Sequence, residues 1–176
     1  MATLSKIYWK NWLNPVDPTS GGVENRNSAA VGIIYSSGEI ILIKRNERED
    51  DPWTGQIALP GGFSKFGEQP EETVLREVME EVNMSFTGES IYAELHTNSP
   101  NKANWIKVHP FVLKTRSLEG FKAGPEVSEV RRVKLSGRIE SRTENGYDSF
   151  VFQDWIVWGL TYRILKDFIE MEKEFS

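Results

Sequence analysis

The sequence predicts a single domain of the mixed α/β (α+β) class, in which a mixed β-sheet lies between helices. Three observations lead to this fold class. Runs rich in β-branched residues occur before, between and after two segments with helical periodicity. The length of 176 residues suits one sizeable core, and no internal repeat divides the chain. We expect the domain to span residues 28–176, with an N-terminal arm over residues 1–27 packed on it.

The first half of the chain gives the clearest strand signals. Residues 1–27 mix aromatic side chains with prolines and glycines, which predicts a short arm followed by a loop. Residues 28–35 and 39–45 are two β-rich runs around "SSG", a pattern typical of a β-hairpin. Residues 46–62 read as a long loop that contains only one short strand candidate, "QIAL". Long loops in compact domains usually carry function, so this loop is expected to border a site.

The second half contains both predicted helices. Pro70 suits the first position of a helix that should end near Asn83. Pro110 interrupts a later strand and indicates an edge strand or a bulge. The last helix is expected to begin at Asp154 as its N-cap. The remaining expected elements are strands over residues 90–97 and 105–116, a strand end over 126–135, and the last helix over 154–175.

The composition excludes several kinds of protein. The chain contains no cysteine, so disulfides, thiolate metal sites and a cysteine nucleophile are excluded. A formal net charge of −5 provides no broad basic face for phosphate backbones, so no nucleic-acid partner is expected. No stretch resembles a signal peptide or a membrane span. We therefore expect a cytoplasmic protein with a small-molecule substrate and no membrane partner.

The segment "LREVMEEVN", residues 75–83, carries a cluster of carboxylates. At ~100° per residue, its apolar side chains fall in one arc, and Glu77, Glu80 and Glu81 fall in another roughly 120° away. Like charges at this spacing repel, which calls for a cation to offset them. Clustered oxygen ligands without cysteine or histidine suit Mg²⁺ or Mn²⁺. A solvated acidic face paired with Arg76 is the alternative that this segment leaves open.

The residues before the helix favour a ligand site, because Gly61 and Gly62 let the backbone approach a ligand or another segment closely. The whole segment from Gly62 to Met84, "GFSKFGEQPEETVLREVMEEVNM", resembles the Nudix box, the signature of the Nudix hydrolase family. Asn83 departs from that signature, since the family usually has glycine there; asparagine is the next-best residue for a left-handed helix cap. The positions in register are Gly62, Glu68, Arg76, Glu77, Val78, Glu80, Glu81 and Met84.

This resemblance implies a Nudix-like α/β/α sandwich and the activity of a diphosphatase, a pyrophosphohydrolase that uses Mg²⁺ or Mn²⁺. Glu77, Glu80 and Glu81 would hold one or more metal ions, and a metal-activated water would hydrolyse a diphosphate linkage. Glu80 is our first choice for the general base. The resemblance also implies that Glu68 pairs with Arg76, and that these two residues and Gly62 support the site.

Two further stretches are similar to the coenzyme A pyrophosphatase branch of the family. They are "ILIKRN" followed by "TGQIALPGG", and "VWGLTYRIL". This likeness implies a nucleoside diphosphate linked to another moiety as the substrate, with coenzyme A or a derivative as the first candidate. Two alternatives stay open. One is a pyrophosphatase for ADP-ribose or another nucleotide sugar or dinucleotide, and the other is a non-catalytic module that senses nucleotides.

A few side chains outside the box are also candidates for the site. Arg45 could reach a substrate phosphate, Trp53 could stack on an adenine ring, and Gln56 could hydrogen-bond a substrate. Glu126 and Glu129 are candidates for an extra base or metal ligand. The alternatives are a solvated charge mixture for the charged residues and anchoring of the loop for Trp53. The sequence leaves open the exact substrate, the number of metal ions, and the choice between a monomer and a homodimer.

Overall fold

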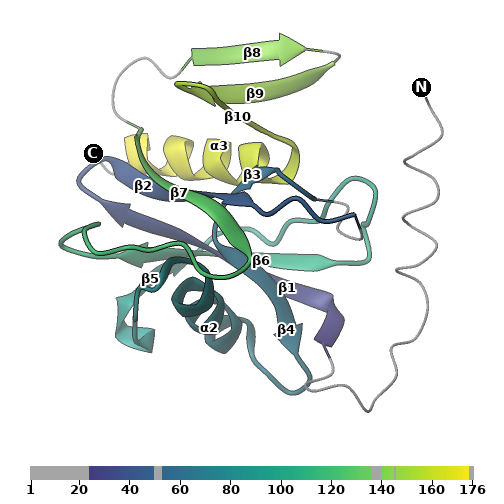
Figure 1. The fold of residues 1–176 in the computed structure, drawn as a ribbon, viewed down its shortest axis with the longest axis vertical. Coiled ribbons are helices and arrows are strands. Elements are labelled where there is room, and N and C mark those ends of the chain that lie inside the picture. Colours follow the sequence, from purple (N-terminus) through teal and green to yellow (C-terminus); the bar gives the residue numbers. More distant parts are fainter. Residues whose placement is uncertain (1–23, 50–52, 136–139, 145, 175–176) are drawn as a thin grey trace.

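The computed structural model describes residues 24–49, 53–135, 140–144 and 146–174. Helix α2 covers one face of a central sheet, and helix α3 with a small second sheet covers the other (Figure 1). The predicted mixed α/β class, with a mixed sheet between helices, is thereby confirmed. Most of the expected N-terminal arm lies outside the described residues, and the first strand begins at Glu24. No helix in the described part of the chain is long and apolar enough to cross a membrane.

The central sheet has seven strands, and its path runs β3-β2-β1-β6-β5, with β4 paired to β1 and β7 paired to β2. Strands β1 and β6 are parallel, which makes the sheet mixed. The strands are β1 Glu24–Ser36, β2 Glu39–Arg45, β3 Ile57–Ala58, β4 Gly61–Lys65, β5 Ile91–Glu94, β6 Lys107–Lys114 and β7 Val127–Lys134. The helices are α2 Pro70–Val82, the short 3-10 helix η1 Gly88–Ser90, and α3 Gly159–Glu174. The small antiparallel sheet contains β8 Glu140–Glu144, β9 Tyr147–Phe152 and β10 Trp155–Trp158.

The strands β1 and β2 separate after a short paired region, and this separation creates the place for the site. They pair next to the hairpin turn, at Tyr35 with Ile40. Farther from the turn, β1 pairs with β4 instead, so that Val31 lies opposite Gly61. Strand β2 meanwhile pairs with β3 and β7. The start of β4 therefore enters the opening between β1 and β2, directly beneath α2.

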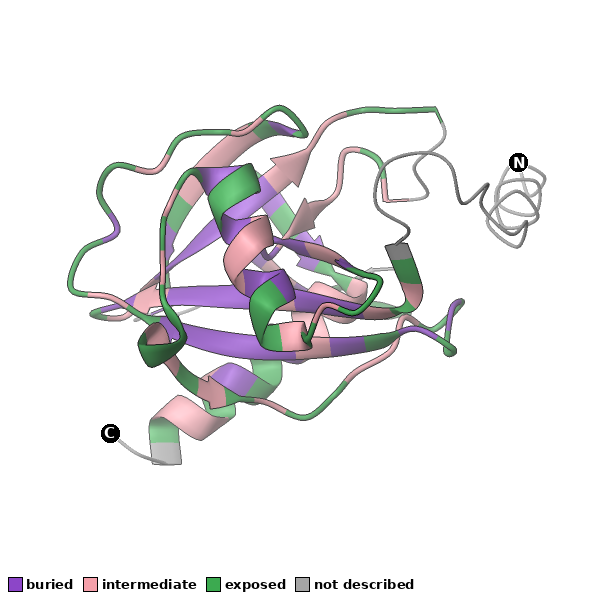
Figure 2. Ribbon diagram, turned by 90° about the horizontal axis from the view of Figure 1, so that it is seen from below, coloured by how far each residue is buried: buried purple, intermediate pink, exposed green. Residues whose placement is uncertain are grey.

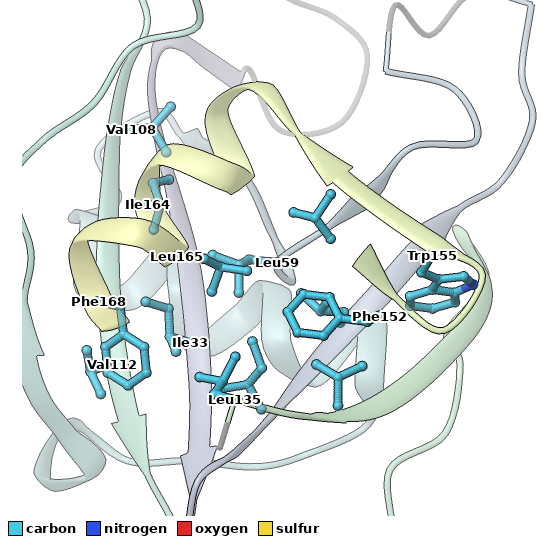
Figure 3. Packing of buried hydrophobic residues seen from close by; sticks show 14 of the residues in the cluster. Ile33, Leu59, Val108, Val112, Leu135, Phe152, Trp155, Ile164, Leu165 and Phe168 are labelled. Carbon is cyan, nitrogen blue, oxygen red and sulfur yellow. The ribbon is translucent and has the colours of Figure 1, made fainter. Parts of the chain in front are cut away.

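The apolar runs of β1 and β2 are buried on both faces, as is usual for strands in the middle of a covered sheet. Because side chains alternate along a strand, Ile40 and Leu42 belong to the cluster under α3, and Ile41 and Ile43 to the cluster under α2. Figure 2 shows buried residues along the central strands and on the inner side of α2. Figure 3 shows the α3 cluster, where the helix packs over the sheet through Ile164, Leu165 and Phe168.

Both predicted ends of α2 are confirmed. Pro70 is the first helical residue, and the Gln69 backbone N–H donates to the Glu72 carboxylate at 2.9 Å, which caps the start of the helix. Asn83 ends the helix in the left-handed conformation, with φ 56° and ψ 34°, and its N–H donates to the Met79 carbonyl at 3.1 Å. Asparagine therefore fills the capping position in which the family signature has glycine.

The expectation that Pro110 marks an edge strand is wrong, because β6 runs between β1 and β5. The sheet accommodates the proline for a local reason. The Pro110 carbonyl accepts from the Leu95 N–H at 2.8 Å, and Leu95 directly follows β5. The missing proline N–H therefore falls where the pairing with β5 ends, and the bulge lies in β5 itself, between Ile91 and Ala93.

The expected N-cap at Asp154 is also wrong. Asp154 lies in the turn between β9 and β10, and α3 begins only at Gly159. Strand β10 has the alternation of a strand, since Trp155 and Val157 are buried. Val157 also fits the 3.6-residue series that continues into α3, which is why the helical pattern extended too far toward the N-terminus.

We predict that the left-handed conformation of Asn83 contributes to the stability of α2. Replacing Asn83 with alanine should lower the free energy of unfolding by about 1 kcal/mol, because a Cβ without a polar group disfavours positive φ. Replacing it with glycine should leave the stability unchanged or raise it by a few tenths of a kcal/mol. Urea unfolding followed by circular dichroism measures both changes. Asn101→Ala is the control, since Asn101 is exposed and has no positive φ; equal losses for the two alanine variants would contradict the prediction.

Candidate active site

The turn of α2 from Glu77 to Glu81 carries three carboxylates of very different exposure. The side chain of Glu81 is 4% exposed, that of Glu77 is 14% exposed and that of Glu80 is 53% exposed. Glu81 belongs to the same buried face of the helix as Val74 and Val78. The alternative of a solvated acidic face therefore does not describe Glu77 or Glu81.

The guanidinium of Arg76 holds this turn against the loop that precedes the helix. Its Nε and Nη2 atoms donate to the two carboxylate oxygens of Glu68 at 2.8 and 3.0 Å. Its Nη1 atom donates to Glu77 at 2.6 Å and to Glu80 at 3.0 Å. Nη2 also donates to the Phe63 carbonyl at 3.0 Å. The planar fork of arginine allows this simultaneous contact, which the single ammonium of lysine could not reproduce.

Glu68, the expected partner of Arg76, is fixed by several donors. Besides Arg76, it accepts from the Lys65 N–H at 2.8 Å and from the Thr73 hydroxyl at 3.0 Å. The hydrogen bonds from Arg76 lower the pKa of Glu68 to about 2, with smaller contributions from Lys65 and Thr73. Glu68 is therefore ionised at neutral pH and ties the β4–α2 loop to the helix.

The start of β4 forms the floor beneath the carboxylates. A Cβ atom added to Gly62 would lie 2.7–2.8 Å from the carboxyl atoms of Glu77, so any other residue there would displace this carboxyl group from its present position. The neighbouring Gly61 N–H donates to Oε2 of Glu81 at 2.8 Å. Gly62 thus lets the backbone of β4 pass directly against Glu77, and the N–H of the neighbouring Gly61 binds Glu81.

The electrostatic state of the turn indicates a shortage of positive charge. Burial raises the pKa of Glu81 to about 8, and the negative charges of Glu77 and Glu126 act in the same direction. The hydrogen bond from Gly61 and the charge of Arg45 oppose this rise only in part. Burial also raises the pKa of Glu77, against the opposing charge of Arg76. An added cation would favour the ionised form of both carboxyl groups.

Two segments outside the box bring further charged groups to the turn. Arg45, at the end of β2, places Nη1 at 3.8 Å from Oε1 of Glu81. Glu126, just before β7, lies near enough for its charge to act on both Glu77 and Glu81. Its exposed carboxylate also pairs with Arg48 at 3.5 Å. The structure therefore brings Arg45 and Glu126 to the carboxylates of α2.

Three other candidates lie elsewhere or are held by other contacts. Trp53 packs against the cluster under α3, with its ring 6.3 Å from that of Phe63, which agrees with anchoring of the loop. Glu129 pairs with Arg131 at 2.6 Å, and that guanidinium lies over Trp155 on the α3 side of the sheet. Glu129 is therefore not part of the acidic cluster. The Gln56 carbonyl accepts from the Arg45 N–H at 3.0 Å, which places Gln56 beside the site through its backbone.

The donor set fits an Mg²⁺ or Mn²⁺ ion that is bound by few protein ligands. Among the described residues, no three acidic, histidine or cysteine side chains already converge on one point. Magnesium at phosphate-handling sites usually takes one or two carboxylates and completes its shell with water and phosphate oxygens. Glu81 offers a buried carboxylate and Glu77 a partly buried one, with too little positive charge around them, and Glu80 adds an exposed carboxylate at the margin of the turn.

Sequence reasoning missed some groups that shape the site. The first two residues of β4, Gly61 and Gly62, fall in the loop expected over residues 46–62, although "PGG" correctly indicated a close approach of the backbone. The contact of Gly124 with α2 was also missed: its N–H donates to the Glu81 carbonyl at 2.9 Å. The dipeptide Gly124–Pro125 is a turn signal that could have drawn attention to this loop. Asn46, which contacts the same loop, was not among the candidate residues.

Comparison with known proteins gives a family match and two partial relatives. The family model described as NUDIX domain matches residues 25–147. An ADP-ribose pyrophosphatase from Methanocaldococcus jannaschii is 46% identical over 56 residues, which is 32% of this chain and 31% of that protein. An 8-oxo-dGTP diphosphatase from Escherichia coli K12 is 34% identical over 73 residues, which is 42% of this chain and 56% of that protein. The matched segments thus cover less than two thirds of either relative.

Solved structures give a similar fold at low sequence identity. A MutT/nudix family protein from Enterococcus faecalis has a TM-score of 0.63 at 18% identity, over 98% of this chain and 70% of that one. A bifunctional NMN adenylyltransferase/ADP ribose pyrophosphatase from Francisella tularensis, complexed with AMP and a Mn ion, has a TM-score of 0.53 at 20% identity. That match covers 73% of this chain and 38% of the other. These likenesses support the fold.

The raised pKa of Glu81 predicts how the stability of the metal-free protein depends on pH. In the unfolded chain this carboxyl group ionises near its ordinary pKa of about 4.3, whereas in the folded protein it stays protonated up to about pH 8. The folded state therefore binds more protons between these values, and the free energy of unfolding should fall as pH rises from about 4.5 to 8. Glu81→Gln should remove this part of the pH dependence. The difference in free energy of unfolding between the variant and the parent should therefore increase in favour of the variant as pH rises, to the order of a few kcal/mol.

Urea unfolding at pH 5, 6.5 and 8 in the presence of EDTA measures this difference. Glu80→Gln is the matched control, because the same substitution at an exposed position of the same turn should leave the slope almost unchanged. Parallel pH profiles for the parent and Glu81→Gln would contradict the assignment of a raised pKa to Glu81.

Proposed function

The chain belongs to the Nudix family, since the family model spans more than half of its residues, and on that premise we propose that it is a Mg²⁺- or Mn²⁺-dependent diphosphatase. Its substrate would be a nucleoside diphosphate linked to another moiety, cleaved at the diphosphate linkage. The observation that carries this proposal is the pair of carboxylates formed by the buried Glu81 and the partly buried Glu77, packed against the glycine backbone of β4 with too little positive charge to balance them.

The residues of the acidic turn would have different roles, because their environments differ. Glu77 and Glu81 would hold the metal ion, since their positions are fixed by Arg76 and by the Gly61 N–H. A bound metal ion would neutralise charge on the diphosphate and lower the pKa of a water molecule. Glu80, exposed and at the margin of the turn, remains the first choice for the base that accepts the proton of that water. Glu126 is the second candidate for this role.

Other residues would position these groups and the substrate. Arg76 and Glu68 hold the helix and the β4–α2 loop in a fixed relation, so that the carboxylates keep their places. Arg45 lies beside Glu81 and would turn to a phosphate oxygen once a metal ion takes over the carboxylate. Gln56, next to Arg45, is the remaining candidate for a hydrogen bond to the substrate. Trp53 and Glu129 have no role in this proposal.

Two substrate classes are supported by different observations. The identity of 46% with part of an ADP-ribose pyrophosphatase favours ADP-ribose or a related nucleotide sugar. The stretches "ILIKRN" and "VWGLTYRIL" favour coenzyme A or a derivative. Both substrates contain an adenosine diphosphate whose linkage lies between the two phosphorus atoms. The acidic turn would perform the same chemistry on either, so the choice depends on the loops that surround it.

We predict metal-dependent hydrolysis that is lost when the acidic turn is neutralised. The test uses a panel of ADP-ribose, coenzyme A, a dinucleoside polyphosphate and 8-oxo-dGTP, with Mg²⁺ or with EDTA, and identifies the products by mass spectrometry. Glu77→Gln and Glu81→Gln should each lower kcat/KM by about 10²- to 10⁴-fold, because each removes a ligand charge while keeping the size of the side chain. Glu71→Gln is the matched control, since Glu71 is an exposed glutamate in the first turn of the same helix.

The outcomes separate the proposal from its alternatives. The absence of metal-dependent turnover on the whole panel would overturn the proposed activity. Saturable binding of a nucleotide in calorimetry, with the nucleotide intact after long incubation with Mg²⁺, would support a sensing module instead. Hydrolysis in H₂¹⁸O shows which phosphorus atom the water attacks, because the label appears in only one of the two products.

A further inference from the structure

We propose that Asn46 is a positioning residue that holds the loop before β7, and with it Glu126, against the acidic turn of α2. The structural part of this inference stands by itself. The consequence for catalysis rests on the proposed function. Asn46 directly follows β2 and lies next to Arg45, at the start of the loop that the sequence predicts to border a site.

Asn46 binds the loop through both its backbone and its side chain. Its N–H donates to the Glu126 carbonyl at 3.1 Å, and its Nδ2 atom donates to the Pro125 carbonyl at 2.7 Å. Two adjacent peptide carbonyls are thus held by one residue. A backbone contact alone would leave the loop able to rotate, whereas two donors at neighbouring carbonyls fix its orientation.

The carbonyl of Asn46 connects these two hydrogen bonds to the loop between β2 and β3. It accepts from the Gly55 N–H at 3.4 Å and from the Thr54 hydroxyl at 3.3 Å. The Thr54 hydroxyl in turn accepts from the Arg48 N–H at 2.5 Å. Asn46 therefore ties the loop between β2 and β3 to the loop before β7.

The other side of the same loop is fixed on the C-terminal end of α2. The Gly124 N–H donates to the Glu81 carbonyl at 2.9 Å, and the Lys122 N–H donates to the Val82 carbonyl at 3.0 Å. These are carbonyls that the end of a helix leaves without an intrahelical partner. A Cβ atom at Gly124 would lie 1.8 Å from the Glu80 carbonyl oxygen, so only glycine allows this approach.

Glu126 is held by its backbone between these two attachments, while its exposed carboxylate pairs with Arg48 at 3.5 Å. Its carboxylate is 62% exposed, and its charge acts on both Glu77 and Glu81. A carboxylate on an untethered loop would spend only part of its time near the turn. Because Asn46 and α2 fix the loop from opposite sides, the carboxylate is already close to the acidic turn. This lowers the entropy cost of bringing the carboxylate into the reaction.

The first test measures the tether itself by hydrogen–deuterium exchange of the metal-free protein. Asn46→Ala should speed exchange of the Lys122 and Gly124 amides by about five- to tenfold, because loss of one clamp makes local opening of the loop easier. Asn46→Asp is the second variant, since it keeps the size and the backbone bonds and replaces the amide donor to Pro125 with a charged carboxylate that cannot donate. It should speed exchange of the same amides. Asn98→Ala is the matched control: Asn98 also donates from Nδ2 to a carbonyl, that of His96 at 2.9 Å, away from this loop.

The second test measures the consequence for catalysis with a double-mutant cycle. Asn46→Ala and Glu126→Gln should each lower kcat by about 10- to 100-fold with a smaller effect on KM, because both would remove the same positioned carboxylate. Combined in one protein, they should cost hardly more than Glu126→Gln alone. Asn98→Ala should leave kcat unchanged in both backgrounds, and thermal unfolding shows that each variant is folded.

The outcomes decide the two parts separately. Unchanged exchange at Lys122 and Gly124 in both Asn46 variants would overturn the tether. Faster exchange together with fully additive kinetic losses would overturn the positioning of Glu126. If the parent protein hydrolyses nothing on the substrate panel, the proposed function fails and its catalytic consequence with it, whereas the exchange experiment still decides the role of Asn46 in the fold.

Discussion

The acidic turn depends on the guanidinium of Arg76, which lies among Glu68, Glu77 and Glu80 and binds all three. Removing one partner of a buried ion pair typically costs about 3–5 kcal/mol, because the remaining charge stays buried without compensation. Here one cation pairs with three carboxylates, so the acidic turn depends on Arg76 more strongly than a simple ion pair depends on one of its members. Its donors are directed to these three residues and the Phe63 carbonyl, and Glu81 is left with the Gly61 N–H and a longer contact to Arg45.

Features that depend on local sequence were predictable. The limits of α2 follow from Pro70 and Asn83, and the first hairpin follows from two apolar runs around a short polar turn. The ion pair of Glu68 with Arg76 followed only from the family signature, since the two residues lie on different elements and no periodicity relates them. The glycines predicted that the backbone of β4 comes close to another segment. They did not predict that the Gly61 N–H binds Glu81.

Features that depend on contacts between distant segments were not predictable from one sequence. The burial of Glu81 is an example, because its place among the valines of α2 becomes a buried place only when β4 and the Gly124 loop pack against it. The side of the sheet that Glu129 faces is another, since it is set by the pairing of Glu129 with Lys44 of β2, and a register shift separates this pair from the next one at Val127. Strand β10 was mistaken for helix because a short apolar run satisfies both periods.

Burial gives the carboxylates of the turn different chemical properties, although their spacing is that of ordinary neighbours on a helix. Glu81 is held by Gly61 and stays protonated in the folded, metal-free protein up to about pH 8. Binding of a divalent cation at this carboxylate at neutral pH must therefore release a proton, so affinity for the cation would rise with pH until the group is ionised. Glu80 is half exposed at the margin of the turn, where it accepts from Arg76 at 3.0 Å. The same helical turn thus supplies a buried carboxyl group whose ionisation is coupled to the cation, and an exposed carboxylate at its margin.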